Sequence, residues 1–468
     1  MPLLNKKYFF IVSIIITVAA CKKFVQVDPP IDQPTEVSLF ADDNTATAAW
    51  TGIYNNMMQT FRFLSSDITT YAGVSSDELS YFNPPANPFL TNSIPSDNST
   101  INTMWQQAYQ YIYQTNACME GLLNNSKITE RTKNQLTGEA KFVRALCYFY
   151  LVNLWGDVPL IISTDYAANA TTGRTSKAQI YQQIISDLKD AQTLINDGYV
   201  KSDNTVYTTS IEKIRPNKSA VTALLSRVHL YTGDWSNAEM QSTTIINSGM
   251  YSLPALNSAF LKNNTEAIWQ LQPINSSYNT LEGNRFIPFN VGGVFMTFPA
   301  YPLTNSLMNA FESGDQRKSI WVGVDVYSGT TYYFPYKYKV YSGNPPLNEY
   351  YTVLRLGEQY LIRAEARAQQ NNLAGAISDL NVIRMRTTLA DLPTSLNKTQ
   401  VLAAVEQERR IELFAEWGHR WLDLKRTNRA DPVLNIIKSP NWQITDILWP
   451  IPQSQININL NLTQNPGY

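Results

Sequence analysis

Histidine and recognisable catalytic motifs are what this sequence most clearly lacks. It holds two histidines, His229 and His419, in 468 residues, whereas a zinc or iron site built on imidazoles normally draws on two or three. It also contains no Gly-x-Ser-x-Gly turn, no Walker loop and no Gly-x-Gly-x-x-Gly motif. Positive evidence for catalysis is therefore missing, and we expect no metal site and no other cofactor.

Charge is scarce and balanced. Charged residues make up 16% of the chain and the formal net charge is −1, so the phosphates of nucleic acid would not attract it. We expect no nucleic-acid partner. The sequence is instead rich in tyrosine and tryptophan, with 27 and 10 residues. This composition is typical of a secreted protein whose surface carries solvent-exposed aromatic residues. Tyrosine also packs well in a core when its hydroxyl has a hydrogen-bond partner.

Cysteine is nearly absent beyond residue 21. Cys118 and Cys147 both lie in apolar patterns of helical period, where a free thiol behaves as a small hydrophobic group. A disulfide between them is the alternative, if their two helices pack together. The sequence leaves both interpretations, two free thiols or one disulfide, open.

One long hydrophobic run occurs, and it lies at the N-terminus. Tyr8 to Ala20 are almost wholly apolar, but thirteen residues are too few to cross a bilayer, which takes about 20. The run is typical of a secretory signal peptide, and it ends in Val18-Ala19-Ala20-Cys21, which resembles a bacterial lipobox. We predict a signal peptide over residues 1–20 and lipidation of Cys21, with two or more acyl chains giving stable anchoring. The alternative is an ordinary secretory signal with a chance cysteine.

The residues after Cys21 change character twice. Residues 21–36 are polar, contain three prolines and have no periodicity, which favours a lipidated tether that holds the folded part away from the membrane. A helical pattern begins near Asn44. Residues 65–100 then mix Ser, Asn, Asp and Pro with aromatic residues, so we expect a long irregular stretch there.

Further helices are predicted by apolar periodicity over 104–123, 137–154 and 176–196. Thr137 is the expected cap of the second of these helices, and Gly156 with Pro159 is the expected stop signal. Short β-like runs occur at 266–272 and 331–340. Both runs lie within residues 250–350, which are otherwise rich in Gly, Pro, Asn and aromatic residues.

Two segments can be overlaid as weak repeats. Residues 219–247, with a turn at Gly233-Asp234, and residues 358–386 share the spacing of their small and turn residues. This spacing is similar to that of tetratricopeptide helical hairpins, which stack so that neighbours cover each other's apolar faces. A generic helical bundle is the alternative. We predict a mostly α fold of tetratricopeptide-like hairpins, with large irregular aromatic loop insertions and a few short β-strands.

Residues 406–426 (EQERRIELFAEWGHRWLDLKR) are dense in charge. Glu408, Glu412 and Glu416 recur every four residues on one helical face, beside arginines that hold carboxylates ionised. An ionised carboxylate is a poor general acid, so a catalytic pair is disfavoured. We interpret the segment as a structural ion-pair lattice that orders the helix and the turn at Gly418, with Glu416 and Arg420 paired at i,i+4 if the helix continues.

The same segment resembles the C-terminal signature of the SusD/RagB family. Other motifs that resemble this family follow the family's order from signal to C-terminus, which makes the resemblance specific. The matching stretches are Glu408-Arg409-Arg410, Glu412-Leu413, Glu416 with Gly418 and Arg420, Asp423-Leu424, Arg426, Arg144-Ala145 with Tyr148, the run from Trp155 to Leu160, Leu354-Arg355 with Glu358, the run from Ala364 to Ala366, Asp446 to Pro452, and Cys21 to Phe24. Trp417 between Glu416 and Gly418 is a small departure.

The resemblance implies an outer-membrane lipoprotein of Bacteroidetes-type bacteria that faces the cell exterior. It implies a nutrient-binding domain over residues 37–468, with an N-terminal part of about 37–250 and a C-terminal part of about 251–468. Members of the family bind glycans, and sometimes peptides, above a SusC-like TonB-dependent transporter, and they are not enzymes. The function implied is non-catalytic capture of an oligosaccharide or polysaccharide and its delivery to that transporter. Peptide capture is the alternative.

Candidate ligand-binding residues come from the chemistry of sugars, since the motifs carry none over. Sugar C–H faces stack on flat aromatic rings, and their hydroxyls need polar partners in a concave site. Two loop regions and the segment after them fit this chemistry, although local packing is the alternative for each aromatic. The candidates are Asp77, Tyr81, Phe82 and Asn83 in the first loop, Asn275, Tyr278, Arg285, Phe286 and Phe295 in the second, and Trp321 and Tyr332 beyond it. Trp50, Trp105, Trp155 and Trp421 are assigned to the core.

Overall fold

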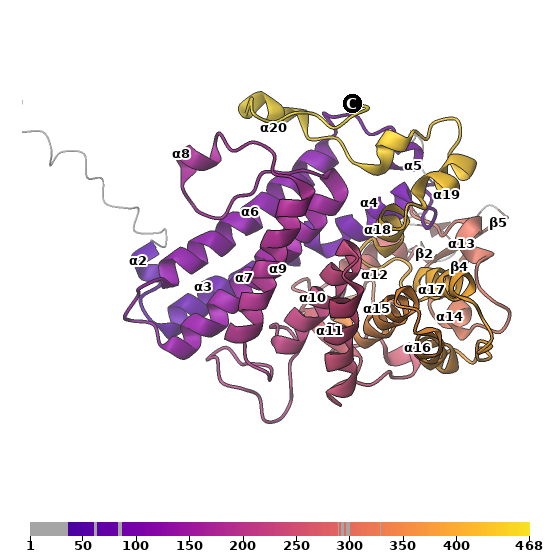
Figure 1. Ribbon diagram of the computed structural model, residues 1–468, viewed down its shortest axis with the longest axis horizontal. Coiled ribbons are helices and arrows are strands. Elements are labelled where there is room, and N and C mark those ends of the chain that lie inside the picture. The colour runs from indigo at the N-terminus through magenta and orange to yellow at the C-terminus, as the bar shows by residue number, and fades with distance from the viewer. Residues whose placement is uncertain are drawn as a thin grey trace, which may run out of the picture.

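Helices make up most of the computed structural model, which describes residues 36–59, 63–82, 87–288, 290–291, 294–295, 300–327 and 329–468 (Figure 1). The predicted signal peptide, Cys21, nearly all of the tether, and Asn83 lie outside these residues. The predicted fold class, mostly α with a few short strands, is confirmed. Among the described residues, no helix is both long enough and apolar enough to cross a membrane.

The long helices pack one against the next through the molecule. In chain order α6 contacts α7, α7 contacts α9, α9 contacts α10, and α10 contacts α11; α11 then contacts α15 and α15 contacts α16. Figure 1 shows this succession from the indigo and purple helices to the orange ones. The bounds are α3 Asp43–Met57, α6 Ser99–Leu122, α7 Glu130–Trp155, α9 Lys177–Leu194, α10 Lys218–Thr232, α11 Trp235–Asn247, α15 Leu356–Gln369 and α16 Leu373–Arg386.

The two predicted repeats are helical hairpins that lie side by side. Residues 219–247 fall in α10 and α11, and residues 358–386 fall in α15 and α16. Gly233 adopts the left-handed conformation, with φ 74°, at the turn between α10 and α11, where glycine meets no steric penalty. Because α11 contacts α15, the second hairpin covers the first although a hundred residues separate them in the chain.

Helix α7 begins earlier than we expected. The side chain of Thr129 accepts a hydrogen bond from the backbone N–H of Thr132, so the helix starts at Glu130 and Thr137 lies inside it. Its first two turns are mostly polar, and for that reason apolar periodicity did not reveal them. The expected stop is confirmed, since Gly156 follows the last helical residue with φ 78°.

The expected irregular stretch over residues 65–100 is in part helical. A π-helical turn, Phe63–Asp67, leads directly into α4, Ile68–Ser75, and the short helix α5 spans Pro88–Thr91. Ser65, Ser66, Thr69 and Thr70 are buried there. Their polarity suggested a loop, whereas they are small enough to pack inside the protein.

Among the described residues, the strands form three separate two-stranded antiparallel sheets. The run at 266–272 is β1, Ala267–Leu271, which pairs with β6, Tyr351–Arg355. The run at 331–340 is strand only as far as Pro335. It is β5, Thr330–Pro335, and pairs with β4, Val322–Tyr327. Asn290–Val291 (β2) pairs with Val294–Phe295 (β3). All five residues of β6 are buried, so it shows none of the alternation that identifies a strand.

The remaining helices, most of them short, complete the described part of the chain. They are α2 Glu36–Leu39, α8 Tyr166–Asn169, η2 Leu256–Ser258, α12 Leu281–Phe286, α13 Asn305–Met308, α14 Gln316–Ile320, α17 Lys398–Glu412, α18 His419–Arg426, α19 Ala430–Ile437, η3 Ile444–Ile447 and α20 Gln453–Ile458.

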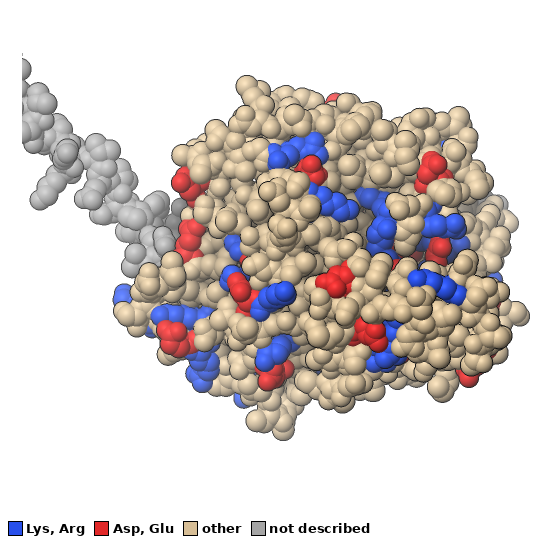
Figure 2. Space-filling model, in the orientation of Figure 1, with Lys and Arg blue, Asp and Glu red and all other residues tan. Residues whose placement is uncertain are grey.

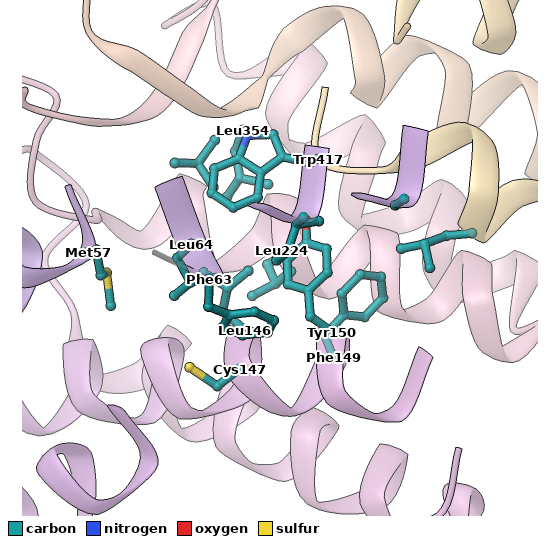
Figure 3. Close-up of a cluster of buried hydrophobic side chains, with 14 of the residues drawn as sticks. Met57, Phe63, Leu64, Leu146, Cys147, Phe149, Tyr150, Leu224, Leu354 and Trp417 are labelled. Atoms are coloured by element: carbon teal, nitrogen blue, oxygen red, sulfur yellow. The ribbon is translucent and has the colours of Figure 1, made fainter. Parts of the chain in front are cut away.

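One hydrophobic core joins the N-terminal and C-terminal parts of the chain. The ring of Tyr150 on α7 lies 6.3 Å from that of Phe63 and 5.8 Å from that of Trp417, and Figure 3 shows Leu146 of the same helix beside Phe63. Trp417 stacks on Tyr351 with ring centroids 4.8 Å apart. Cys118 and Cys147 are both buried and free, so the disulfide alternative is not adopted. The four tryptophans assigned to the core are buried there.

A buried ion-pair network surrounds the C-terminal end of α17. The carboxylate of Glu412 accepts hydrogen bonds from Arg317 (3.0 Å), Arg355 (2.7 Å) and Arg386. Arg355 also pairs with Glu266 and Glu416. Although burial opposes ionisation, the surrounding guanidinium groups lower the pKa of Glu412 well below its usual range. The structural interpretation of residues 406–426 is thus confirmed.

The predicted pair between Glu416 and Arg420 does not form. Helix α17 ends at Glu412, and the turn at residues 413–418 separates it from α18. Glu416 therefore pairs with Arg355 and Lys337, while Arg420 pairs with Asp77 and Glu406.

Replacing Glu412 by Gln should lower the free energy of unfolding by about 3–5 kcal/mol, because it leaves buried guanidinium groups without a counter-charge. Denaturant unfolding measures this as a lower midpoint with an unchanged slope. Glu406→Gln is the matched control on the same helix, since its side chain is 34% exposed and should cost about 1 kcal/mol or less. Equal effects of the two variants would contradict the role given to the network.

Candidate functional site

Partly exposed aromatic rings gather where three segments meet at one side of the molecule. We call Tyr81, Phe82, Tyr301, Tyr327 and Tyr332 the aromatic cluster. The ring of Phe82 lies edge-on to those of Tyr332 (centroids 5.0 Å apart) and Tyr327 (6.0 Å), and Tyr81 lies 5.4 Å from Tyr301. Each of these five side chains is half-buried, so one side of each ring packs on the protein while another faces solvent.

Backbone hydrogen bonds hold the three segments together. The N–H of Ser80 donates to Pro302 (2.7 Å), and the N–H of Phe82 donates to Ala300 (3.2 Å). On the other side, the N–H of Leu303 donates to the carbonyl of Tyr333 in β5 (2.7 Å). The segment over residues 300–303 therefore bridges residues 79–82 to the β4–β5 hairpin, which lies at the right of Figure 1.

Arg285 supplies a fixed positive charge beside the cluster. Its guanidinium donates to Asp67 Oδ1 (2.8 Å), Ser66 Oγ (3.0 Å) and the Tyr71 hydroxyl (3.1 Å), and it lies 5.2 Å from the ring centroids of Tyr71 and Tyr301. Burial alone would lower the pKa of Arg285, but the tyrosines and Asp67 raise it above its ordinary value. Phe286 beside it is buried and meets Tyr301 edge-on at 6.3 Å.

Asp77 precedes Tyr81 and Phe82 in the chain and fixes their segment through ion pairs. It is buried, and its carboxylate accepts from Arg410 Nη2 (2.7 Å) and Arg420 Nε (2.7 Å). Burial raises its pKa, but the two guanidinium groups outweigh that effect and lower the pKa of Asp77 below its ordinary value. Its backbone carbonyl also accepts from the Thr304 hydroxyl (2.5 Å).

The other sequence candidates lie elsewhere or are described only in part. Trp321 is fully buried and donates its indole N–H to the carbonyl of Leu256 (3.0 Å). Asn275 is exposed and lines a small cavity with Met58, Gln59 and Ile274. Tyr278 is half-buried in the segment between β1 and α12. Phe295 lies in β3, where its side chain is not among the described parts of the chain.

Sequence reasoning missed three residues of this region: Tyr71, Tyr301 and Tyr327. Tyr71 lies on α4, in the stretch expected to be irregular. Tyr301 precedes Pro302 in a short segment without periodicity, and an aromatic beside proline was the available signal. Tyr327 ends β4, one of the strands that the sequence did not reveal.

The arrangement suits a ligand with flat apolar faces and hydroxyl groups. Half-buried tyrosine rings offer both a stacking surface and a polar tip, and such rings with a few fixed polar groups are typical of small-molecule sites. Charges of both signs are interspersed over the mostly uncharged face in Figure 2.

Comparison with known proteins gives consistent matches along most of the chain. Residues 23–230 match a family described as starch-binding and associating with the outer membrane, and residues 323–468 match the SusD family. The SusD-like protein P25 of Formosa agariphila is 23% identical over 98% of both chains. A SusD-like protein of Bacteroides ovatus is 22% identical over 90% of this chain and 82% of the relative.

Solved structures share the fold. A SusD homologue from Bacteroides thetaiotaomicron superposes with a TM-score of 0.77 at 20% identity, covering 93% of this chain and 99% of the other. A structure described as a laminarin-binding SusD-like protein has a TM-score of 0.74 at 24% identity, covering 91% of this chain and all of the other.

Glu282, at the start of the helix that carries Arg285, makes the stability of the folded protein depend on pH. Burial raises the pKa of Glu282 to about 8 from 4.5. The folded chain therefore keeps a proton that the unfolded chain releases, so stability from this group is present below pH 4.5 and is lost as pH rises towards 8. Glu282→Gln should remove this loss, which amounts to about 1.4 kcal/mol per pH unit at most.

Denaturant unfolding at several pH values measures the effect as the difference between the variant and the wild type. Glu130→Gln is the control, because the Glu130 side chain is 80% exposed and its replacement should leave the pH profile unchanged. Parallel profiles for Glu282→Gln and the wild type would show that Glu282 does not carry the proton.

Proposed function

Because this chain belongs to the SusD/RagB family, we propose that it binds an oligosaccharide or polysaccharide at the aromatic cluster without modifying it. The bound glycan then passes to a SusC-like TonB-dependent transporter in the outer membrane. The observation that carries this proposal is that Tyr81 and Phe82, which are neighbours in the chain, meet the rings of Tyr301 and Tyr332 from two other segments, and that part of each ring stays open to solvent.

The cluster is also stiff, which favours binding. Residues 79–82 are tied to residues 300–303 by backbone hydrogen bonds, and Asp77 is tied to α17 and α18 by ion pairs. A site whose rings are already ordered loses less conformational entropy when a ligand binds. Arg285 lies 5.2 Å from the ring of Tyr301, which packs against Tyr81, and its guanidinium is oriented by Asp67.

The proposal includes the cellular location of the protein. SusD family members are associated with the outer membrane, and we propose that Cys21 carries the lipid anchor and that residues 22–36 space the binding domain from the membrane. The binding domain would then face the exterior, with the aromatic cluster available to nutrients before they reach the transporter.

Titration calorimetry of residues 22–468 tests the function directly. We expect heat from a soluble glycan such as laminarin or starch, with no release of shorter products. Tyr81→Ala and Tyr332→Ala should each weaken binding about tenfold, which corresponds to about 1.4 kcal/mol, because each removes a stacking surface. Thr331→Ala, at the exposed neighbour of Tyr332 on β5, should leave the affinity unchanged.

Two results would count against the proposal. Wild-type affinity in both tyrosine variants would place the glycan elsewhere on the chain. Heat from peptide digests, with none from glycans, would assign the protein to peptide capture instead.

A further inference from the structure

A second aromatic hollow lies away from the aromatic cluster, between α6, α8 and the C-terminal helix α20. It has a volume of about 400 Å³. We call it the tail groove and define it by Trp105, Tyr109, Tyr113, Tyr166, Ile458 and Leu462. In Figure 1, α8 and α20 lie at the upper left, whereas β4 and β5 lie at the right edge.

Two of the four aromatic residues of the tail groove are unusually open, while Trp105 is buried and Tyr109 is half-buried. Tyr166 is 85% exposed and Tyr113 is 55% exposed. They stand beside Trp105 and Tyr109, whose ring centroids lie 5.1 Å apart. Exposed tyrosines with so much ring surface in solvent gain little from packing, so they add nothing evident to the stability of the fold.

No charged side chain is among the described residues that line the groove. Its polar groups are amides and hydroxyls, including Gln106, Asn169 and Asn459. The surface over α20 is likewise uncharged in Figure 2. A lining of rings, amides and hydroxyls without charge matches a neutral ligand that has both apolar faces and hydroxyl groups. It gives no counter-charge to an acidic or basic one.

The walls of the groove are held in place from both sides. Arg174 donates to the carbonyl of Thr463 (3.0 Å) and to Asn465 Oδ1 (2.5 Å). Asn459 and Asn461 donate their amides to the carbonyls of Thr172 (2.8 Å) and Thr171 (2.7 Å). On the opposite side, the Tyr109 hydroxyl donates to Pro159 (2.8 Å). The groove is therefore organised before any ligand arrives, which lowers the entropic cost of binding.

We propose that the tail groove is a second binding site for a neutral oligosaccharide. The inference rests on the proposed function in one respect, namely that the chain's ligand is a glycan. Sugar rings would stack on Tyr113 and Tyr166, with their hydroxyls within reach of the amides. A polysaccharide that engages both sites gains affinity through effective concentration, although each site alone binds weakly.

Two double variants separate the sites. Tyr81→Ala with Tyr332→Ala weakens the aromatic cluster, and Tyr113→Ala with Tyr166→Ala removes the exposed rings of the tail groove. Leu123→Ala is the control, because Leu123 directly follows α6, is 71% exposed and does not line the groove. The probes are laminarihexaose and maltohexaose, tested on residues 22–468, which keep every residue that the structure describes.

Calorimetry and hydrogen exchange together give the expected result. With the aromatic cluster weakened, one of the two probes should still bind and should slow exchange in residues 159–172 and 453–462. Adding the tail-groove pair of substitutions should weaken this remaining binding at least tenfold and remove the protection. Leu123→Ala in the same background should change neither.

The contrary outcomes are distinct. If the cluster variant loses all binding and no protection appears in residues 159–172, the tail groove is not a glycan site, and the proposed function stands. If binding persists after the tail-groove pair is added, the residual site lies elsewhere and the inference is overturned. If the wild type binds neither probe, the inference and the proposed function both fail for these two glycans.

Discussion

The carboxylate of Glu412 is the point on which the C-terminal half of the structure depends. It receives the guanidinium groups of Arg317, Arg355 and Arg386, which come from α14, the end of β6 and the end of α16. Separating any of these elements from α17 would leave a charged group unpaired in the protein interior. This costs far more free energy than the loss of a solvent-exposed ion pair. Elements distant in sequence are therefore held in one arrangement.

The same network positions the proposed ligand-binding region. Because Arg355 and Lys337 hold Glu416, the turn after α17 is fixed, and so is the place of Arg420 in the first turn of α18. Arg420 and Arg410 then hold Asp77, from which the chain continues to Tyr81 and Phe82. The rings proposed to stack on sugar are thus positioned by buried ion pairs that lie outside the aromatic cluster.

The sequence predicted those features that depend on local chemistry. The α10–α11 hairpin follows from apolar periodicity and Gly233, and the ion-pair interpretation follows from the spacing of Glu408, Glu412 and Glu416. The break after Glu412 was not predictable, because Ala415 and Trp417 adopt positive φ angles of 50° and 49°. Such conformations are unfavourable locally and are maintained by tertiary contacts, among them the hydrogen bond from the Trp417 N–H to Thr69 (3.0 Å).

Prediction of the candidate site from the sequence meets the same limit, because tertiary contacts decide where each residue lies. Tyr81, Phe82 and Tyr332 were chosen as aromatic loop residues, and the structure brings them together. Trp321 was chosen on the same grounds but lies in the core, because the carbonyl of Leu256, 65 residues earlier, accepts its indole N–H. Composition alone does not distinguish the two cases. Only the partner does, and the partner is distant in the chain.

The ion pairs of Asp77 join residues more than 300 positions apart, with Arg410 and Arg420 following almost at the end of the described chain. Contacts of such long range form late, since a large loop must close before they contribute. The helical hairpins can form from neighbouring residues, whereas Tyr81 and Phe82 reach their final positions only once α17 and α18 are in place. A chain interrupted before residue 410 would keep several of its helical hairpins without the ion pairs of Asp77, so the proposed ligand-binding surface becomes ordered in one of the last steps of folding.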